Sequence, residues 1–297
     1  MREGKAMGQD AVCIWAAGAT LGEGALWLAE EQALYWVDIL QPRILRYDPA
    51  TGAQAEWPMP EPIGFIAPRR RGGLVAGLRS GFHLIDLPEG RVTPIGNPEP
   101  DRPGNRFNDG KVDPMGRLWA GTVEFDCAEP TGAFYRLDPD HRWHRMDDGY
   151  IVTNGPAFSP DGSILYEADS ERRVVYAYDL DLASGAIANR RPFVLFADDD
   201  GVPDGMTVDR EGHLWVAHWG GSRVSRFRPD GTLDRAVAIP APHVTSCAFG
   251  GPGLTTLYVT TARTGMSETA LRQHPLAGGL FEIKDAGRGL PGSHFAG

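Results

Sequence analysis

One alternating hydrophobic segment recurs along the chain. Each copy begins with Leu and continues with aromatic, β-branched or small residues, and successive copies start 40, 44, 47, 49 and 43 residues apart. The copies are Leu34–Val37, Leu74–Gly77, Leu118–Gly121, Leu165–Ala168, Leu214–Ala217 and Leu257–Thr260. A period in the low forties built from short strands is the signature of a β-propeller blade. Six copies therefore predict six blades.

Two further short runs accompany each copy. A second alternating run follows it, as in Ile44–Tyr47, and an upstream run begins with a polar or small residue 10 to 12 positions before the Leu. We expect the upstream run to be the innermost strand of each blade. The recurring segment that begins with Leu would be the second strand. Turn residues such as those of 113–116 (Asp-Pro-Met-Gly) would join the innermost strand to it. Residues 11–17 precede the first inner strand and are expected to serve as the outer strand of the last blade.

The predicted fold class is therefore all-β: a six-bladed β-propeller whose N- and C-terminal strands close the last blade. Residues 1–297 are expected to form a single domain, because each blade buries its faces against two neighbours. The 38 Gly and 24 Pro suit a fold that needs frequent tight turns. The Trp residues of the repeated segments (Trp36, Trp119 and Trp215) are expected to pack between blades.

Charge and cysteine usage narrow the functional classes. The net charge is −10, and the longest run of basic residues is Arg69–Arg71, so nucleic acid and anionic membrane surfaces are excluded as partners. The three Cys have no paired spacing, which predicts a reducing compartment without disulfides. No run of apolar residues is long enough to cross a membrane. We expect a cytoplasmic monomer.

The first positions of the six inner strands form a candidate metal site. They are Glu23, Ile63, Asn108, Asn154, Asp204 and Thr245. The innermost strands line the central channel of the propeller and all run in the same direction along it. We therefore expect all six residues at one mouth of this channel. Two carboxylates and two amides in one register are the oxygen donors that a hard divalent cation selects. The alternative is a polar ring that solvates a water-filled channel, and any one of these residues alone could be a turn former.

Other familiar chemistries are not indicated. The eight His are scattered, and only His218 falls at the mouth. The chain has no Gly-x-Ser-x-Gly elbow and no dinucleotide-binding glycine pattern. Trp219, next to His218, either stacks on a bound sugar or packs in the structure.

Several motifs along the whole chain resemble one family. They are Leu21-Gly22-Glu23-Gly24, Asn105-Arg106-Phe107-Asn108-Asp109-Gly110, Thr153-Asn154-Gly155, Pro203-Asp204-Gly205-Met206 and Cys247-Ala248-Phe249-Gly250-Gly251. With these, the chain resembles the SMP-30/gluconolactonase/regucalcin-like family of six-bladed propeller sugar lactonases. The resemblance implies one divalent metal on Glu23, Asn154 and Asp204, with Ca foremost and Zn, Mg, Mn or Fe as alternatives.

The resemblance also implies a substrate site. Arg106 and Asn108 would contact the substrate, and a further acidic contact would come from Glu124 or Asp126, between which the sequence does not decide. The alternative for Arg106 is an ion pair with Asp101 or Asp109.

The residues and the resemblance agree on a function: a metal-dependent hydrolase that opens a sugar lactone to the aldonic acid. The metal would polarise the carbonyl, and Asp204 would activate the attacking water. One alternative is a related esterase or phosphotriesterase-like hydrolase, because the same site can polarise either group. The other is a non-catalytic calcium-binding protein. Arg106 and Asn108 argue against the latter, because ion binding alone requires neither.

Overall fold

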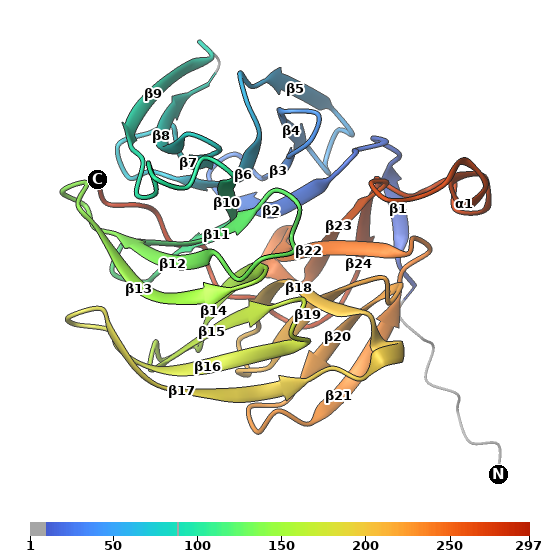
Figure 1. Ribbon diagram of the computed structural model, residues 1–297. Coiled ribbons are helices and arrows are strands. Elements are labelled where there is room, and N and C mark those ends of the chain that lie inside the picture. Colours follow the sequence, from blue (N-terminus) through green and yellow to red (C-terminus); the bar gives the residue numbers. More distant parts are fainter. Residues whose placement is uncertain (1–9, 88) are drawn as a thin grey trace.

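In the computed structural model, which describes residues 10–87 and 89–297, antiparallel four-stranded units are arranged around a common centre (Figure 1). Each unit is one predicted blade. From the innermost strand outward, blade one comprises β2 (Gly22–Leu28), β3 (Ala33–Asp38), β4 (Arg43–Tyr47) and β5 (Gln54–Pro58), and blade two comprises β6 (Ile63–Pro68), β7 (Leu74–Leu78), β8 (Gly81–Asp86) and β9 (Arg91–Gly96). Blade three comprises β10 (Asn105–Val112), β11 (Leu118–Glu124), β12 (Gly132–Leu137) and β13 (Trp143–Tyr150).

The remaining blades repeat the pattern. Blade four comprises β14 (Thr153–Phe158), β15 (Ile164–Asp169), β16 (Val174–Asp181) and β17 (Ala186–Leu195), and blade five comprises β18 (Val202–Val208), β19 (Leu214–Trp219), β20 (Arg223–Phe227) and β21 (Leu233–Ala238). Blade six comprises β22 (His243–Gly250), β23 (Thr256–Ala262), β24 (Leu280–Ile283) and β1 (Val12–Trp15). The all-β, six-bladed prediction is confirmed.

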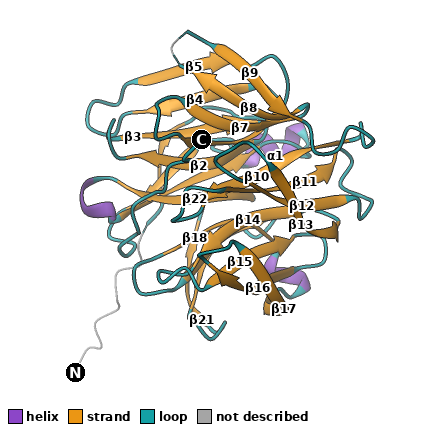
Figure 2. Cartoon of the chain, turned by 90° about the vertical axis from the view of Figure 1, so that its left-hand side faces the viewer, coloured by secondary structure: helices purple, strands orange, loops and turns teal. Residues whose placement is uncertain are grey.

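In residues 10–87 and 89–297, helix is confined to short segments between strands (Figure 2). They are α1 (Glu268–Gln273) and the 3₁₀ turns η1 (Asp198–Asp200) and η2 (Pro252–Leu254). Within the described residues, none of the helices has the length and apolar character required to cross a bilayer.

The last blade combines the two ends of the chain, as the sequence predicted. Val12 of β1 pairs with Glu282 of β24 in an antiparallel ladder. A single bridge between Trp219 and His243 also connects blade six to blade five. The N-terminal strand thereby completes a sheet whose other strands lie near the C-terminus.

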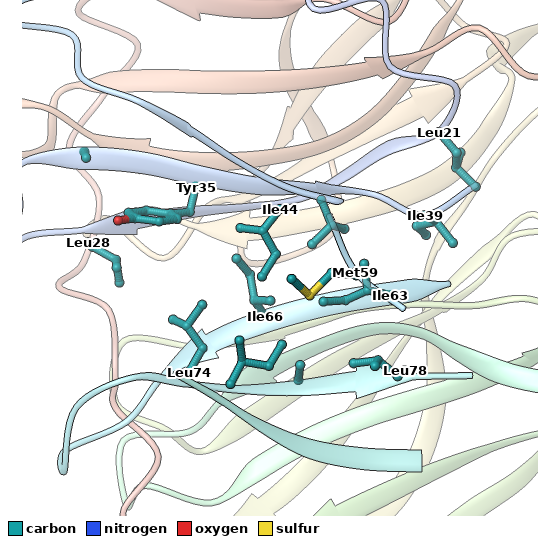
Figure 3. Close-up of a cluster of buried hydrophobic side chains, with 14 of the residues drawn as sticks. Leu21, Leu28, Tyr35, Ile39, Ile44, Met59, Ile63, Ile66, Leu74 and Leu78 are labelled. Carbon is teal, nitrogen blue, oxygen red and sulfur yellow. The ribbon is translucent and has the colours of Figure 1, made fainter. Parts of the chain in front are cut away.

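Hydrophobic side chains fill the spaces between neighbouring blades. The second strand of each blade is buried on both faces, so its residues alternate between two interfaces. In β3, Tyr35 and Val37 face blade two, whereas Leu34 and Trp36 face blade six. Figure 3 shows the interface of blades one and two, which includes Tyr35, Ile44, Met59, Ile63, Ile66 and Leu74. Burying one such side chain contributes about 1.5–3 kcal/mol.

The Trp residues of the repeated segments pack between blades as predicted. Trp36, Trp119 and Trp215 are at most 1% exposed. The indole of Trp119 donates to Asp113 at 2.9 Å, and that of Trp215 donates to Asp209 at 3.0 Å. These aspartates begin the turns between the first and second strands, so each turn is anchored to the core of its own blade.

The innermost strands share an irregularity. In each one, the pairing with the second strand shifts register, and the shifts follow Glu23, Ile63, Phe107, Asn154, Pro203 and Val244. A bulge of this kind bends the strand and turns side chains away from the regular alternation. The predicted rim positions therefore lie at or beside the shifts.

The C-terminal segment, residues 284–297, crosses the bottom face of the propeller, the face that carries the turns between the first and second strands. Its backbone bonds to turns of several blades: Gly289 to Leu254, Phe295 to Pro68 and Ala296 to Gly116. The Phe295 side chain is fully buried in the cluster between blades two and three. The repeat pattern ends before this segment and does not predict its course.

Candidate metal and substrate site

Five predicted site residues come together from four inner strands. Glu23 lies on β2, Arg106 and Asn108 on β10, Asn154 on β14 and Asp204 on β18, and each is between 4% and 8% exposed. Arg106 Nη1 donates to Asn108 Oδ1 at 2.7 Å, and Asn108 Nδ2 donates to Asn154 Oδ1 at 3.0 Å. The carboxyl groups of Glu23 and Asp204 lie close enough to shift each other's pKa.

The bulges explain how neighbouring residues contribute to one site. In β10, Phe107 pairs with Thr122 and Gly110 pairs with Ala120, so Asn108 and Asp109 stand opposite one residue. Glycines after two of the rim residues adopt positive φ angles, 62° at Gly24 and 97° at Gly155, which other residues rarely adopt.

Asp109 is a site residue that the sequence did not single out. It is buried and accepts hydrogen bonds from the backbone amides of Gly110 at 2.7 Å and Gly155 at 3.1 Å. It acts electrostatically on both Glu23 and Asp204. Three carboxylates, rather than two, therefore share this buried region.

Burial governs the protonation of these carboxylates. Desolvation raises the pKa of Glu23, and the charge of Asp109 raises it further. Desolvation also raises the pKa of Asp204, followed by repulsion from Glu23 and Asp109. Burial raises the pKa of Asp109 to about 6, and nearby Lys111 opposes that shift. Without additional positive charge, the Glu23–Asp204 pair retains a proton.

The residues present fit a divalent cation. Glu23, Asn154 and Asp204 offer carboxylate and amide oxygens, the donors that Ca²⁺ and similar hard ions prefer. Two buried carboxyl groups that repel each other gain from a bound cation, because cation binding replaces their shared proton. The neighbouring Arg106 supplies one positive charge, which leaves the carboxylates in excess.

The raised carboxyl pKa values predict a pH-dependent stability of the metal-free protein. The folded state keeps a proton that the unfolded chain releases above about pH 4.3. The contribution of this proton to the free energy of unfolding is therefore fully present below that pH. It is lost as the pH rises through the folded-state pKa. In excess chelator, we expect the melting temperature to fall from about pH 5 to pH 8, and to fall less in Glu23→Gln. Equal slopes for the two proteins would contradict the assignment.

Arg106 is buried without a carboxylate partner. No ion pair joins it to Asp101, Asp109 or any other described residue, so the predicted alternative is not seen. Its guanidinium lies 5.5 Å from the ring centre of Phe125, and burial lowers its pKa from a high starting value. Nη1 also donates to the carbonyl of Phe107 at 3.0 Å.

The two acidic candidates beside this cluster lie at its edge. Asp126 is exposed, and Glu124 is half-buried and accepts from the backbone amide of Glu129 at 3.1 Å. Neither forms a hydrogen bond with the five gathered residues. Their charges, together with that of Arg106, act on the half-buried thiol of Cys127. Both therefore lie near Arg106 at the mouth, and the choice between them stays open.

His218 and Trp219 belong to the packing around the mouth. His218 Nδ1 lies 2.8 Å from the carbonyl oxygen of Asp200, and burial lowers the pKa of His218 to about 4. Trp219 stacks on His243 with ring centres 4.1 Å apart. Of the two alternatives for Trp219, the structure shows the packing contact.

A second acidic cluster lies in the bottom turn of blade five, between β18 and β19. Asp209, Glu211 and His213 have ligand atoms within 4.8 Å of one another. Arg226 Nη2, however, lies 2.7 Å from Asp209 and 2.6 Å from Glu211. A cation would have to displace this guanidinium, so the cluster fits a metal less well than the site on the inner strands.

The candidate site borders two cavities. Arg106 lines one of about 330 Å³, which lies between blades two and three together with Arg79, Glu99 and Arg102. Gly24 and Asp109 line the other, a channel cavity of about 530 Å³ that the C-terminal segment also lines. Small molecules and water therefore have space on both sides of the cluster.

Comparisons with known proteins find relatives that match nearly the whole chain. The family model of the SMP-30/Gluconolactonase/LRE-like region matches residues 21–263. The chain is 37% identical to regucalcin of Xenopus laevis over 292 residues, which cover 96% of this chain and 98% of regucalcin. It is 37% identical to the 6-deoxy-6-sulfogluconolactonase of Pseudomonas putida over 279 residues, which cover 94% of this chain and 96% of that enzyme.

A solved structure shows the same architecture. The calcium-binding protein regucalcin from Agrobacterium tumefaciens superposes with a TM-score of 0.92 at 27% sequence identity, covering 95% of this chain and 96% of that one. The matched region contains all five gathered residues. The chain belongs to the SMP-30/gluconolactonase family.

Proposed function

We propose that this protein is a divalent-metal-dependent hydrolase that opens a sugar lactone to the corresponding aldonic acid. The observation that carries the proposal is the buried Glu23–Asp204 pair beside the chain of hydrogen bonds from Arg106 through Asn108 to Asn154. A 6-deoxy-6-sulfogluconolactonase among the relatives supports the substrate class.

Glu23, Asn154 and Asp204 would hold the metal. When bound there, a cation would supply Lewis-acid stabilisation of the developing oxyanion, worth several kcal/mol. Asp204 would coordinate in its ionised form, and it would therefore be free of the proton that the metal-free pair retains.

Asp204 would act as the general base. Its carboxylate takes a proton from water as the water oxygen bonds to the carbonyl carbon. The bond between that carbon and the ring oxygen then breaks, and Asp204 returns the proton to the departing oxygen. The product is an open-chain acid with a new hydroxyl group, and the carboxylate is regenerated.

Arg106 and Asn108 would position the sugar. Arg106 has donors that are not used within the described part of the chain, and its planar fork suits adjacent oxygens. Asn108 is held by the carbonyl of Thr153 at 2.7 Å and by Asn154, so its orientation is fixed before substrate arrives. Such preorganisation reduces the ordering cost of binding.

The test measures acid release by titration at constant pH. The substrates are gluconolactone, xylonolactone, arabinonolactone and rhamnonolactone. The protein is first freed of metal with a chelator and then supplied with Ca²⁺, Zn²⁺, Mg²⁺ or Mn²⁺ in turn. We expect hydrolysis above the spontaneous rate only after metal is restored. Hydrolysis that is equal with and without metal would rule out the proposed site.

Arg106→Lys is expected to raise KM more than it lowers kcat. Lysine keeps the charge but loses the planar fork, so uniform binding of the substrate weakens. We expect a KM increase of about tenfold, the cost of one charge-assisted hydrogen bond. Steady-state kinetics with metal content measured in parallel check this. An unchanged KM would remove Arg106 from the substrate site.

A second candidate function is calcium binding without catalysis. The observation that favours it is the similarity to proteins named regucalcin, one of them described as calcium-binding. Calorimetric binding of Ca²⁺ with no hydrolysis of any lactone tested would support this candidate over the enzyme.

A further inference from the structure

Two arginines lie close to the same aromatic ring near the candidate site. The guanidinium carbon of Arg79, which follows β7, lies 5.3 Å from the ring centre of Phe125, and that of Arg106 lies 5.5 Å from it. Arg79 and Arg106 also line the 330 Å³ cavity between blades two and three. The guanidinium groups of Arg79 and Arg106 therefore lie near the Phe125 ring, and both residues line the same cavity.

Both arginines have unused donors. Arg106 directs Nη1 to the protein, whereas its Nε is buried with no acceptor among the described residues. Arg79 is exposed, and its side-chain hydrogen bond is a long one of 3.4 Å to the carbonyl of Pro103. Neither arginine forms an ion pair with a residue that the structure describes. Guanidinium groups with free donors bind carboxylate, sulfonate or phosphate through paired hydrogen bonds.

The carboxylates of the cavity wall are already engaged. Glu99 accepts from Asn105 at 2.9 Å, from Thr122 at 3.1 Å and from Tyr135 at 3.0 Å. It also lies 4.0 Å from Arg102.

Glu61, the other acidic residue of this wall, accepts a hydrogen bond from Ser80. Three arginines, Arg79, Arg102 and Arg106, line the cavity with only two carboxylates, Glu61 and Glu99, so its wall carries an excess of positive charge.

We propose that Arg79, together with Arg106 beside the same Phe125 ring, makes this site selective for sugar lactones that carry a second, anionic group. The group would be a carboxylate, sulfonate or phosphate on the part of the carbon chain remote from the lactone carbonyl. Arg106 is connected through Asn108 to Asn154, one of the proposed metal ligands, whereas the side-chain hydrogen bond of Arg79 goes to the carbonyl of Pro103. This inference rests on the proposed lactonase function.

The test compares a neutral lactone, gluconolactone, with three anionic ones: the lactones of glucaric acid, 6-phosphogluconic acid and 6-deoxy-6-sulfogluconic acid. The measured quantity is the ratio of kcat/KM for each anionic lactone to kcat/KM for gluconolactone. A ratio cancels general effects of a substitution on metal content or folding. We expect at least one anionic lactone to be preferred, and its identity names the anion.

Arg79→Gln is expected to lower that ratio about tenfold, which corresponds to the loss of one charge-assisted hydrogen bond. The matched control is Arg91→Gln, which removes an exposed arginine of β9 and should leave the ratio unchanged. An Arg79→Gln ratio equal to that of the unmodified protein would overturn the inference, as would a preference for gluconolactone over all three anionic lactones.

A binding measurement separates this inference from the proposed function. If no lactone is hydrolysed, the proposed function fails, and calorimetry with glucarate, 6-phosphogluconate and 6-deoxy-6-sulfogluconate then decides the anion site. Binding that weakens about tenfold in Arg79→Gln supports the site. Undetectable binding, or equal affinity in both proteins, overturns it.

Discussion

Asp204→Ala is expected to abolish both metal retention and lactone hydrolysis. The proposed site has three protein ligands, and removing one leaves two oxygens to compete with the hydration shell of the ion. Loss of a residue that merely supports a ligand commonly costs 10–100-fold in affinity, so loss of the ligand itself should cost more than about 100-fold. Glu23→Gln should have a similar effect. Elemental analysis after dialysis and acid release from gluconolactone are the measurements.

The bottom turn of blade five provides the matched control. Glu211→Gln alters a carboxylate of the other acidic cluster, far along the chain from Glu23 and Asn154. It should leave metal content and hydrolysis intact. If Glu211→Gln lost the metal while Asp204→Ala kept it, the metal would belong to the turn, and the assignment to the inner strands would be wrong.

Asp204→Asn should separate the two roles of this residue. The amide retains an oxygen that can coordinate metal, but it cannot accept a proton from water. We expect partial metal retention and a fall in kcat of about 10²–10⁴-fold, which is typical for loss of a general base. Titration to full metal occupancy before the kinetic assay distinguishes loss of the base from loss of the ion. A fully loaded and active Asp204→Asn enzyme would assign the base to another residue.

Much of the fold was predictable because the repeat specifies it. The offset of 10 to 12 positions between each rim residue and the following Leu sets the register of each blade, and it correctly places Glu23, Asn154 and Asp204 on three inner strands. The two-sided burial of β3 follows from a segment with no exposed face, Leu34-Tyr35-Trp36-Val37. Even the partner of β1 could be deduced, because blade six lacked an outer strand.

The parts that could not be predicted depend on departures from the repeat. Asp109 reads as a turn residue in Asn-Asp-Gly, and only the bulge in β10 turns it toward Glu23 and Asp204. Arg79 follows an ordinary second strand, and its position beside Phe125 depends on a loop from a different blade. The choice between Glu124 and Asp126 depends on the same loop, for which the sequence has no periodic signal.

The pairing of β1 with β24 has a consequence for how the chain is assembled. Val12 is synthesised long before its partner Glu282. Domains generally begin to fold from the N-terminal side during synthesis, so blades one to five can form while β1 is still without its sheet. Until β24 is synthesised, β1 is an unpaired strand that could join a neighbouring chain. Productive folding therefore requires β1 to stay unpaired until β24 is available.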